Sequence, residues 1–192
     1  MSTAHKQTVI SEEDYLAGEL TADFKSEFID GRIYAMTGAS INHDRLTVNL
    51  LRRIGNHLEG KPCQPYSADI KVKVGSKYFY PDVTVDCTSP AGDSHFTQTP
   101  VIIVEVLSKS TRRMDETTKR IAYLQIPTLQ EYVLIEQDFA DIEVVRRSNS
   151  WLPEHYFLGD EFSLDSIGLT LSVEAVYDRV QNSDVSEWWA GR

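Results

Sequence analysis

The sequence contains no long apolar run, and this excludes an integral membrane protein of the helical kind. None of its apolar segments approaches the roughly 20 residues that a membrane-spanning helix requires. Residues 1–7 are polar and lack the apolar centre of a signal peptide. We therefore expect a protein without membrane association, located in the cytoplasm.

Cysteine is scarce, with only Cys63 and Cys87 among 192 residues. Their spacing matches no zinc-binding motif, so a structural metal held by thiolates is not expected. Isolated thiols of a cytoplasmic protein stay reduced. The sequence therefore predicts two reduced, partly buried thiols.

Motifs of covalent catalysis and of nucleotide binding are also missing. No Gly-x-Ser-x-Gly sequence occurs, and neither cysteine has an identifiable catalytic partner. No glycine-rich loop that could hold phosphate groups is present. Serine or cysteine hydrolases and P-loop nucleotide hydrolases are therefore disfavoured.

Positively charged residues are fewer than negatively charged ones, and the formal net charge is therefore −10. A general nucleic-acid coat protein would be basic. The charge is uneven, however: residues 67–80 and 101–123 are each net positive by two, which leaves −14 for the remainder. Either this is an ordinary solvated surface or these windows contact phosphates, with five candidate residues: Lys71, Lys73, Lys109, Arg112 and Arg113.

Length and hydrophobic patterning predict one α/β domain with a core over about residues 12–180 and a polar tail over 181–192. A strand, a helix and a strand over 101–135 form a crossover unit, whereas tight turns join the earlier strands, so a mixed sheet flanked by helices is expected. Helices are expected over 12–18, 41–58, 110–125 and 172–180, and strands over 27–29, 32–36, 70–74, 78–85, 101–107, 132–135, 142–146 and 151–158. Pro81 lacks an N–H and suggests an edge or a bulge in its strand.

Two carboxylates stand inside predicted strands. Asp82 follows Pro81, and Glu105 is the only polar residue of the segment 101–107. A lone carboxylate in a strand buried on both faces costs several kcal/mol unless a cation compensates it. Two carboxylates with a lysine are a usual set for Mg²⁺-assisted phosphodiester cleavage, and a structural network with Lys or Arg is the alternative.

Lys119 is the candidate lysine, in the predicted helix 110–125. It lies four residues after Asp115 and four before Tyr123, so these side chains share one helix face. An ion pair between Asp115 and Lys119 is one interpretation. The other is that Lys119 reaches a cleft, where it orients the attacking water or stabilises charge on a phosphate.

The order of these residues resembles the PD-(D/E)xK nuclease superfamily. The chain contains the segments Tyr-Pro-Asp-Val and Ile-Val-Glu-Val-Leu-Ser-Lys-Ser-Thr, followed by Asp115, Lys119-Arg120 and Tyr123 and then by Glu-Tyr-Val-Leu-Ile. Together these segments resemble more closely the Uma-two family of restriction endonucleases. The match runs from about residue 12 to residue 180. It implies a restriction-endonuclease-like mixed β-sheet with additional antiparallel strands, and DNA cleavage that depends on Mg²⁺ or Mn²⁺.

The resemblance also assigns roles to residues. It implies that Asp82, Glu105 and the backbone carbonyl of Val106 bind the metal. The superfamily lysine two residues after Glu105 is replaced here by Leu107, and in this family the lysine stands on the following helix, which indicates Lys119.

Two further residues match family positions, namely Glu27 ahead of the hairpin turn and His43 near the start of the long helix. Glu27 is a candidate metal ligand. His43 is a candidate phosphate contact or base, with an exposed histidine at a helix start as the alternative.

The sequence thus favours a Mg²⁺-dependent DNA endonuclease. Two alternatives stay open: a catalytically silent DNA- or protein-binding module on the same fold, and a metal-dependent hydrolase of small phosphoesters. Trp188 and Trp189 in the polar tail either pack back on the domain or contact a second subunit, so a homodimer is a further expectation.

Overall fold

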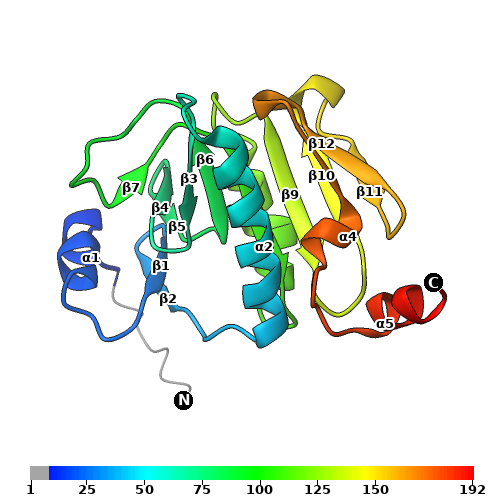
Figure 1. Ribbon diagram of the computed structural model, residues 1–192. Coiled ribbons are helices and arrows are strands. Elements are labelled where there is room, and N and C mark those ends of the chain that lie inside the picture. The colour runs from blue at the N-terminus through cyan, green and yellow to red at the C-terminus, as the bar shows by residue number, and fades with distance from the viewer. Residues whose placement is uncertain (1–8) are drawn as a thin grey trace, which may run out of the picture.

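A computed structural model describes residues 9–192, and the expectation for residues 1–7 lies outside them. These residues form two large sheets and a small one, joined by helices (Figure 1). The mixed α/β architecture predicted from the sequence is confirmed. Among residues 9–192, no helix has the length and apolar character needed to cross a membrane.

The first sheet has five strands in the order β2-β1-β5-β4-β7. Their bounds are β1 Ser26–Ile29, β2 Arg32–Ala35, β4 Lys71–Val74, β5 Lys77–Phe79 and β7 Phe96–Thr97. The β1–β2 hairpin turns at Asp30 and Gly31, which both have positive φ, as a tight two-residue turn requires. The hairpin expected from Asp-Gly is therefore confirmed.

The second sheet has six strands in the order β11-β10-β9-β8-β6-β3. Their bounds are β3 Gln64–Ser67, β6 Val83–Asp86, β8 Pro100–Leu107, β9 Glu131–Glu136, β10 Ile142–Arg146 and β11 Pro153–Tyr156. Strands β8 and β9 are parallel and their neighbours antiparallel, as the predicted crossover unit requires. A two-stranded sheet, β12 Glu161–Leu164 with β13 Leu169–Ser172, was not predicted.

Helices lie on both sides of the second sheet, whereas the first helix of the chain packs against the first sheet. They are α1 Glu12–Glu19, α2 Ile41–Leu58, the π-helical η1 Met114–Lys119, α3 Arg120–Tyr123, α4 Val173–Val176 and α5 Ser183–Ala190, with 3-10 turns η2 Arg147–Asn149 and η3 Asp165–Ile167. The apolar stripe of α2 packs on Val104 and Val106 of β8. Ile103 and Leu107, on the other face of β8, pack with Tyr123 and with Val72 of the first sheet. Glu105 lies on this second face by the two-residue period.

Three expectations need correction. The single strand 78–85 is two strands, β5 and β6, which belong to different sheets and are separated by residues 80–82. The last helix does not extend over 172–180, because only α4 is helical there after its Ser172 cap. The polar tail instead contains α5, capped by Asn182 and fixed by the buried Val185.

The cysteines provide a fourth correction, because Cys63 and Cys87 form a disulfide rather than two reduced thiols. They flank the paired strands β3 and β6, which brings them opposite each other. Sequence separation of 24 residues gave no sign of this pairing, which the strand register creates.

Candidate active site

The candidate site lies where the chain passes from the first sheet to the second. Strand β5 ends at Phe79, and β6 begins at Val83, paired with Val104 of β8. Pro81 has no N–H and cannot continue a ladder, so pairing is interrupted here. The carboxylate of Asp82 fills the gap, because its Oδ2 accepts a hydrogen bond of 2.7 Å from the backbone N–H of Val106. This fixes Asp82 beside Glu105.

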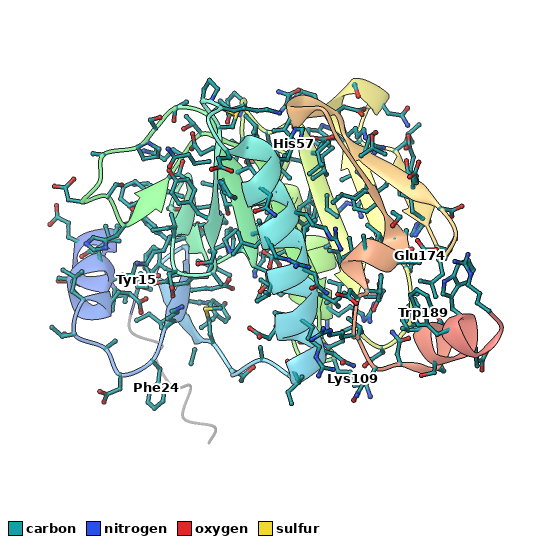
Figure 2. All side chains as sticks on the ribbon, in the orientation of Figure 1. Tyr15, Phe24, His57, Lys109, Glu174 and Trp189 are labelled. Atoms are coloured by element: carbon teal, nitrogen blue, oxygen red, sulfur yellow. A yellow bond between two sulfur atoms is a disulfide. The ribbon has the colours of Figure 1, made fainter. Side chains whose placement is uncertain are left out.

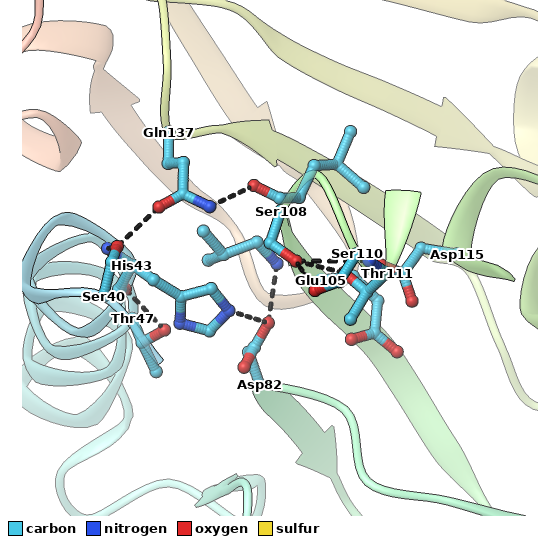
Figure 3. Close-up of polar contacts among 12 residues, drawn as sticks. Ser40, His43, Thr47, Asp82, Glu105, Ser108, Ser110, Thr111, Asp115 and Gln137 are labelled. Carbon is cyan, nitrogen blue, oxygen red and sulfur yellow. Dashed lines mark hydrogen bonds and ion pairs between the residues drawn. The ribbon is translucent and has the colours of Figure 1, made fainter. Parts of the chain in front are cut away.

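His43 approaches Asp82 from the long helix α2 (Figure 3). Ser40 caps this helix by accepting the backbone N–H of His43 at 3.1 Å, which sets the position of its first turn. The His43 Nε2 then lies 3.3 Å from Asp82 Oδ2, with side chains 16% and 14% exposed. Burial lowers the pKa of His43, but the contacts with Asp82 outweigh it and the net pKa is raised. The pair forms the solvent-accessible edge of the site.

Behind this edge, Lys119 binds three carboxylates. Its Nζ lies 2.9 Å from Glu27 Oε1, 3.1 Å from Asp115 Oδ1 and 3.2 Å from Glu105 Oε1. Lys119 itself is only 4% exposed. The hydroxyl of Tyr123 donates to Glu105 Oε1 at 2.9 Å. The predicted shared face of Asp115, Lys119 and Tyr123 is thus present and turned inward, where it meets strands of both sheets.

The π-helical turn η1 presents this face to Glu105. Both Asp115 and Lys119 lie within it, and both are buried. A π-helical turn widens the helix and is frequent at functional sites. Tyr132 accommodates it, donating from its hydroxyl to the Asp115 carbonyl at 3.1 Å.

Negative charge exceeds positive charge in this cluster. Four carboxylates (Glu27, Asp82, Glu105 and Asp115) face one lysine, which leaves an excess of three negative charges when all four are ionised and His43 is neutral. Burial raises the pKa of Glu105 well above its usual value; Lys119 opposes this, whereas Asp115, Asp82 and Glu27 add to it. Burial lowers the pKa of Lys119, yet the carboxylates raise it more, so the ammonium stays charged. A further cation would stabilise the remaining negative charge.

The donor set fits Mg²⁺. Among residues 9–192, no three His, Cys, Asp or Glu side chains are grouped as a metal-binding cluster. Mg²⁺, however, is usually held by one or two carboxylates and keeps several waters. Asp82 Oδ1 and Glu105 Oε2 accept no hydrogen bond from the described part of the chain. The backbone of Val106 also borders this space, because its N–H donates to Asp82 Oδ2. Two carboxylates therefore border one region beside the Val106 backbone.

The five candidate phosphate contacts are not equivalent. Lys71 is 5% exposed, Lys73 pairs with Glu12 at 2.7 Å, and Arg112 makes a two-pronged ion pair with Glu136. Lys109 and Arg113 are exposed on the segment that follows Glu105. Figure 2 shows Lys109 at the surface. Only these last two present a charge to solvent close to the site.

Sequence reasoning did not identify every residue of the site. It treated Asp115 only as a helical partner of Lys119, although their four-residue spacing was the available signal. It had no signal for Gln137, whose Nε2 donates to the Leu107 carbonyl at 2.9 Å and whose Oε1 accepts from Ser40 at 2.6 Å (Figure 3). This bridge joins the start of α2 to the end of β8.

Comparison of the whole chain with known proteins points to one family. Residues 12–174 match the family model Uma2, described as "Putative restriction endonuclease". Two proteins of Synechocystis sp. are similar: slr1290, 36% identical over 88% of this chain and 91% of that protein, and sll1609, 39% identical over 67% and 76%. Both carry the description "Uncharacterized protein". A crystal structure from Anabaena variabilis, described as a "putative nuclease belonging to DUF820", has a TM-score of 0.73 at 18% identity and covers 90% of this chain and 99% of its own.

Proposed function

Because the chain belongs to the Uma-two (Uma2) family of restriction-endonuclease-like proteins, we propose that it is a Mg²⁺-dependent DNA endonuclease whose metal site contains Asp82 and Glu105. One observation carries the proposal: Asp82 and Glu105 meet in a cluster where carboxylates outnumber cations. Such an arrangement costs free energy in a buried place and is relieved by a divalent cation.

The residues have different proposed roles, which follow from their positions. Asp82, Glu105 and the Val106 carbonyl would hold Mg²⁺, or Mn²⁺ in its place. When bound, the metal would stabilise negative charge on the phosphate and lower the pKa of a water molecule for attack. His43 holds the carboxylate of Asp82 in place at the open edge, where it can contact the phosphate or accept a proton.

Lys119 has a role different from that of a free catalytic lysine. Its ammonium is shared among Glu27, Asp115 and Glu105, so it fixes Glu105 and reduces repulsion inside the cluster. Glu27 accepts the Tyr80 N–H at 3.1 Å and is thereby held at the same point. We assign Lys119 and Glu27 to the catalytic centre because they position Glu105. For DNA contacts, the exposed Lys109 and Arg113 are favoured over Lys71, Lys73 and Arg112.

The test is nicking of supercoiled plasmid with Mg²⁺ or Mn²⁺, comparing the wild type with Asp82→Asn. The asparagine oxygen can still accept the Val106 N–H, so the backbone contact is retained while the charge is lost. Asp138→Asn, on an exposed aspartate, is the matched control. We expect metal-dependent nicking by the wild type and the control, and none by Asp82→Asn. Equal nicking by all three proteins would reject the site.

Binding measurements separate the alternatives. Tightening of duplex DNA binding by Ca²⁺ that disappears in Asp82→Asn supports the nuclease. DNA binding that is indifferent to Ca²⁺ and to Asp82 indicates the silent module. Absence of DNA binding, together with metal-dependent hydrolysis of a small phosphomonoester or diester, indicates the small-phosphoester hydrolase.

A further inference from the structure

A second site is present away from the carboxylate cluster. A pocket of about 290 Å³ lies between α1 and the segment Asp93–Phe96, which leads into β7. Leu16, Leu20 and Phe96 contribute its apolar lining, and Lys71 of β4 also lines it. Figure 1 shows α1 and β7 at the same end of the first sheet. The volume of the pocket is close to the lower limit of typical small-molecule sites.

Lys71 is the unusual member of this lining. Val72 and Val74 point into the core shared by the two sheets, so the two-residue period directs Lys71 and Lys73 to the face covered by α1. Lys73 has an ion-pair partner in Glu12. The Lys71 ammonium has neither an ion pair nor a hydrogen-bond acceptor within residues 9–192, although the residue is only 5% exposed.

Aromatic contact only partly compensates this buried charge. The Lys71 Nζ lies 4.9 Å from the centre of the Tyr80 ring, a cation–π contact. Burial lowers the pKa of Lys71, and nearby Lys25 lowers it further against the opposing effect of Glu19. The ammonium of this largely buried residue has no acceptor within the described residues, which costs free energy that an anionic ligand would recover.

The surroundings select the charge and shape of such a ligand. Glu19 is close to Lys71 and is held by the Tyr80 hydroxyl, which donates to its Oε2 at 2.7 Å. Asp93 also lines the pocket. Two carboxylates beside Lys71 disfavour a doubly charged phosphate even with Lys25 nearby, and burial prevents Lys71 from reaching a phosphate on a DNA duplex. The apolar walls favour a hydrocarbon body.

We propose that this pocket binds a small amphipathic monocarboxylate, with its carboxylate paired to Lys71 and its apolar body against Leu16, Leu20 and Phe96. The site is separate from the proposed nuclease centre and does not depend on that function. Lys71, considered from sequence as a DNA contact, thereby acts as the anion-binding group of a small-molecule site.

Isothermal titration with octanoate tests the proposal, with octanamide as a neutral probe of the same apolar body. We expect octanoate to bind the wild type about tenfold more tightly than octanamide, the value of one charge-assisted contact. Lys71→Met keeps the apolar stem and removes the charge, so it should bind the two probes equally. Lys77→Met, whose ammonium pairs with Asp30 instead, is the matched control and should retain the preference.

A measurement on the wild type makes the test independent of the variants. The ¹³Cε resonance of Lys71, titrated with and without octanoate, should report a higher pKa in the complex. Failure of octanoate to bind, equal affinity for both probes in the wild type, or unchanged preference in Lys71→Met would each overturn the proposal.

Discussion

Lys119 illustrates how one buried residue can determine the charge balance of a whole site. It is the only cation that contacts Glu27, Glu105 and Asp115 among the residues described. Sequence alone places it on a helix face with Asp115 and Tyr123, and that much was predictable from the four-residue spacing. Its contact with Glu27 was not, because Glu27 lies 92 positions away and only the packing of the two sheets brings it close.

We predict that Lys119→Met destabilises the fold strongly. The variant keeps most of the side-chain volume but leaves three buried carboxylates without their cation, which costs about 3–5 kcal/mol. Urea unfolding at neutral pH measures the change. Lys109→Met, on an exposed lysine, should change the free energy of unfolding by less than about 0.5 kcal/mol. Similar values for the two variants would contradict the buried ion cluster.

We further predict that two tyrosine hydroxyls contribute differently to the stability of the fold. The Tyr123 hydroxyl donates to the Glu105 carboxylate, and the Tyr132 hydroxyl donates to the backbone carbonyl of Asp115. A hydrogen bond to a charged group contributes about 1.5–3 kcal/mol, against about 0.5–1.5 for a neutral pair. Tyr123→Phe should therefore lower the midpoint of urea unfolding more than Tyr132→Phe. The reverse order would contradict a charge-assisted hydrogen bond between Tyr123 and Glu105.

At the scale of elements, the predictions succeeded where local chemistry decides structure. The helix over 41–58 has the predicted bounds, because its apolar stripe, its Ser40 cap and Gly60 all act locally. The buried strand β8 followed from an apolar run. The division of 78–85 between two sheets was not predictable, since Pro81 signals an interruption but not the destination of the chain. Short polar strands such as β3 gave no periodic pattern at all.

The disulfide is an element-scale feature with a measurable effect. It closes a loop with a sequence separation of 24 residues between Cys63 and Cys87, and chain-entropy reasoning gives a stabilisation of about 3 kcal/mol for such a loop. We predict that dithiothreitol lowers the urea midpoint of the wild type accordingly. The Cys63→Ala, Cys87→Ala double variant should match the reduced protein and should not respond to the reductant. A wild-type midpoint unchanged by reduction would contradict the bond.

At the scale of the whole molecule, the net negative charge means that DNA binding must depend on local contacts. The net charge of −10 provides no long-range attraction, so affinity must come from the few exposed cations near the site. We predict that the Lys109→Met, Arg113→Met double variant binds duplex DNA more weakly, with a salt dependence lower by about two phosphate contacts. Lys73→Met is the control, because Lys73 is already paired with Glu12. Titration at several salt concentrations gives the salt dependence of the affinity for the double variant and for the control. Equal salt dependences for the two would reject these contacts.

The passage of the chain between the two sheets at residues 80–82 determines where insertions can accumulate during evolution. Glu27 stands on one sheet and Glu105 on the other, and Lys119 bonds to both. One added residue between Phe79 and Val83 would shift Asp82 by up to about 3.3 Å along the chain. This displacement exceeds the length of its hydrogen bond with the Val106 N–H, which is 2.7 Å. Residues 89–92, which lie in the other connection between the sheets, carry none of these contacts and take no part in the disulfide, so this loop can lengthen. Length variation among relatives should therefore concentrate in that loop and be absent from the three-residue passage.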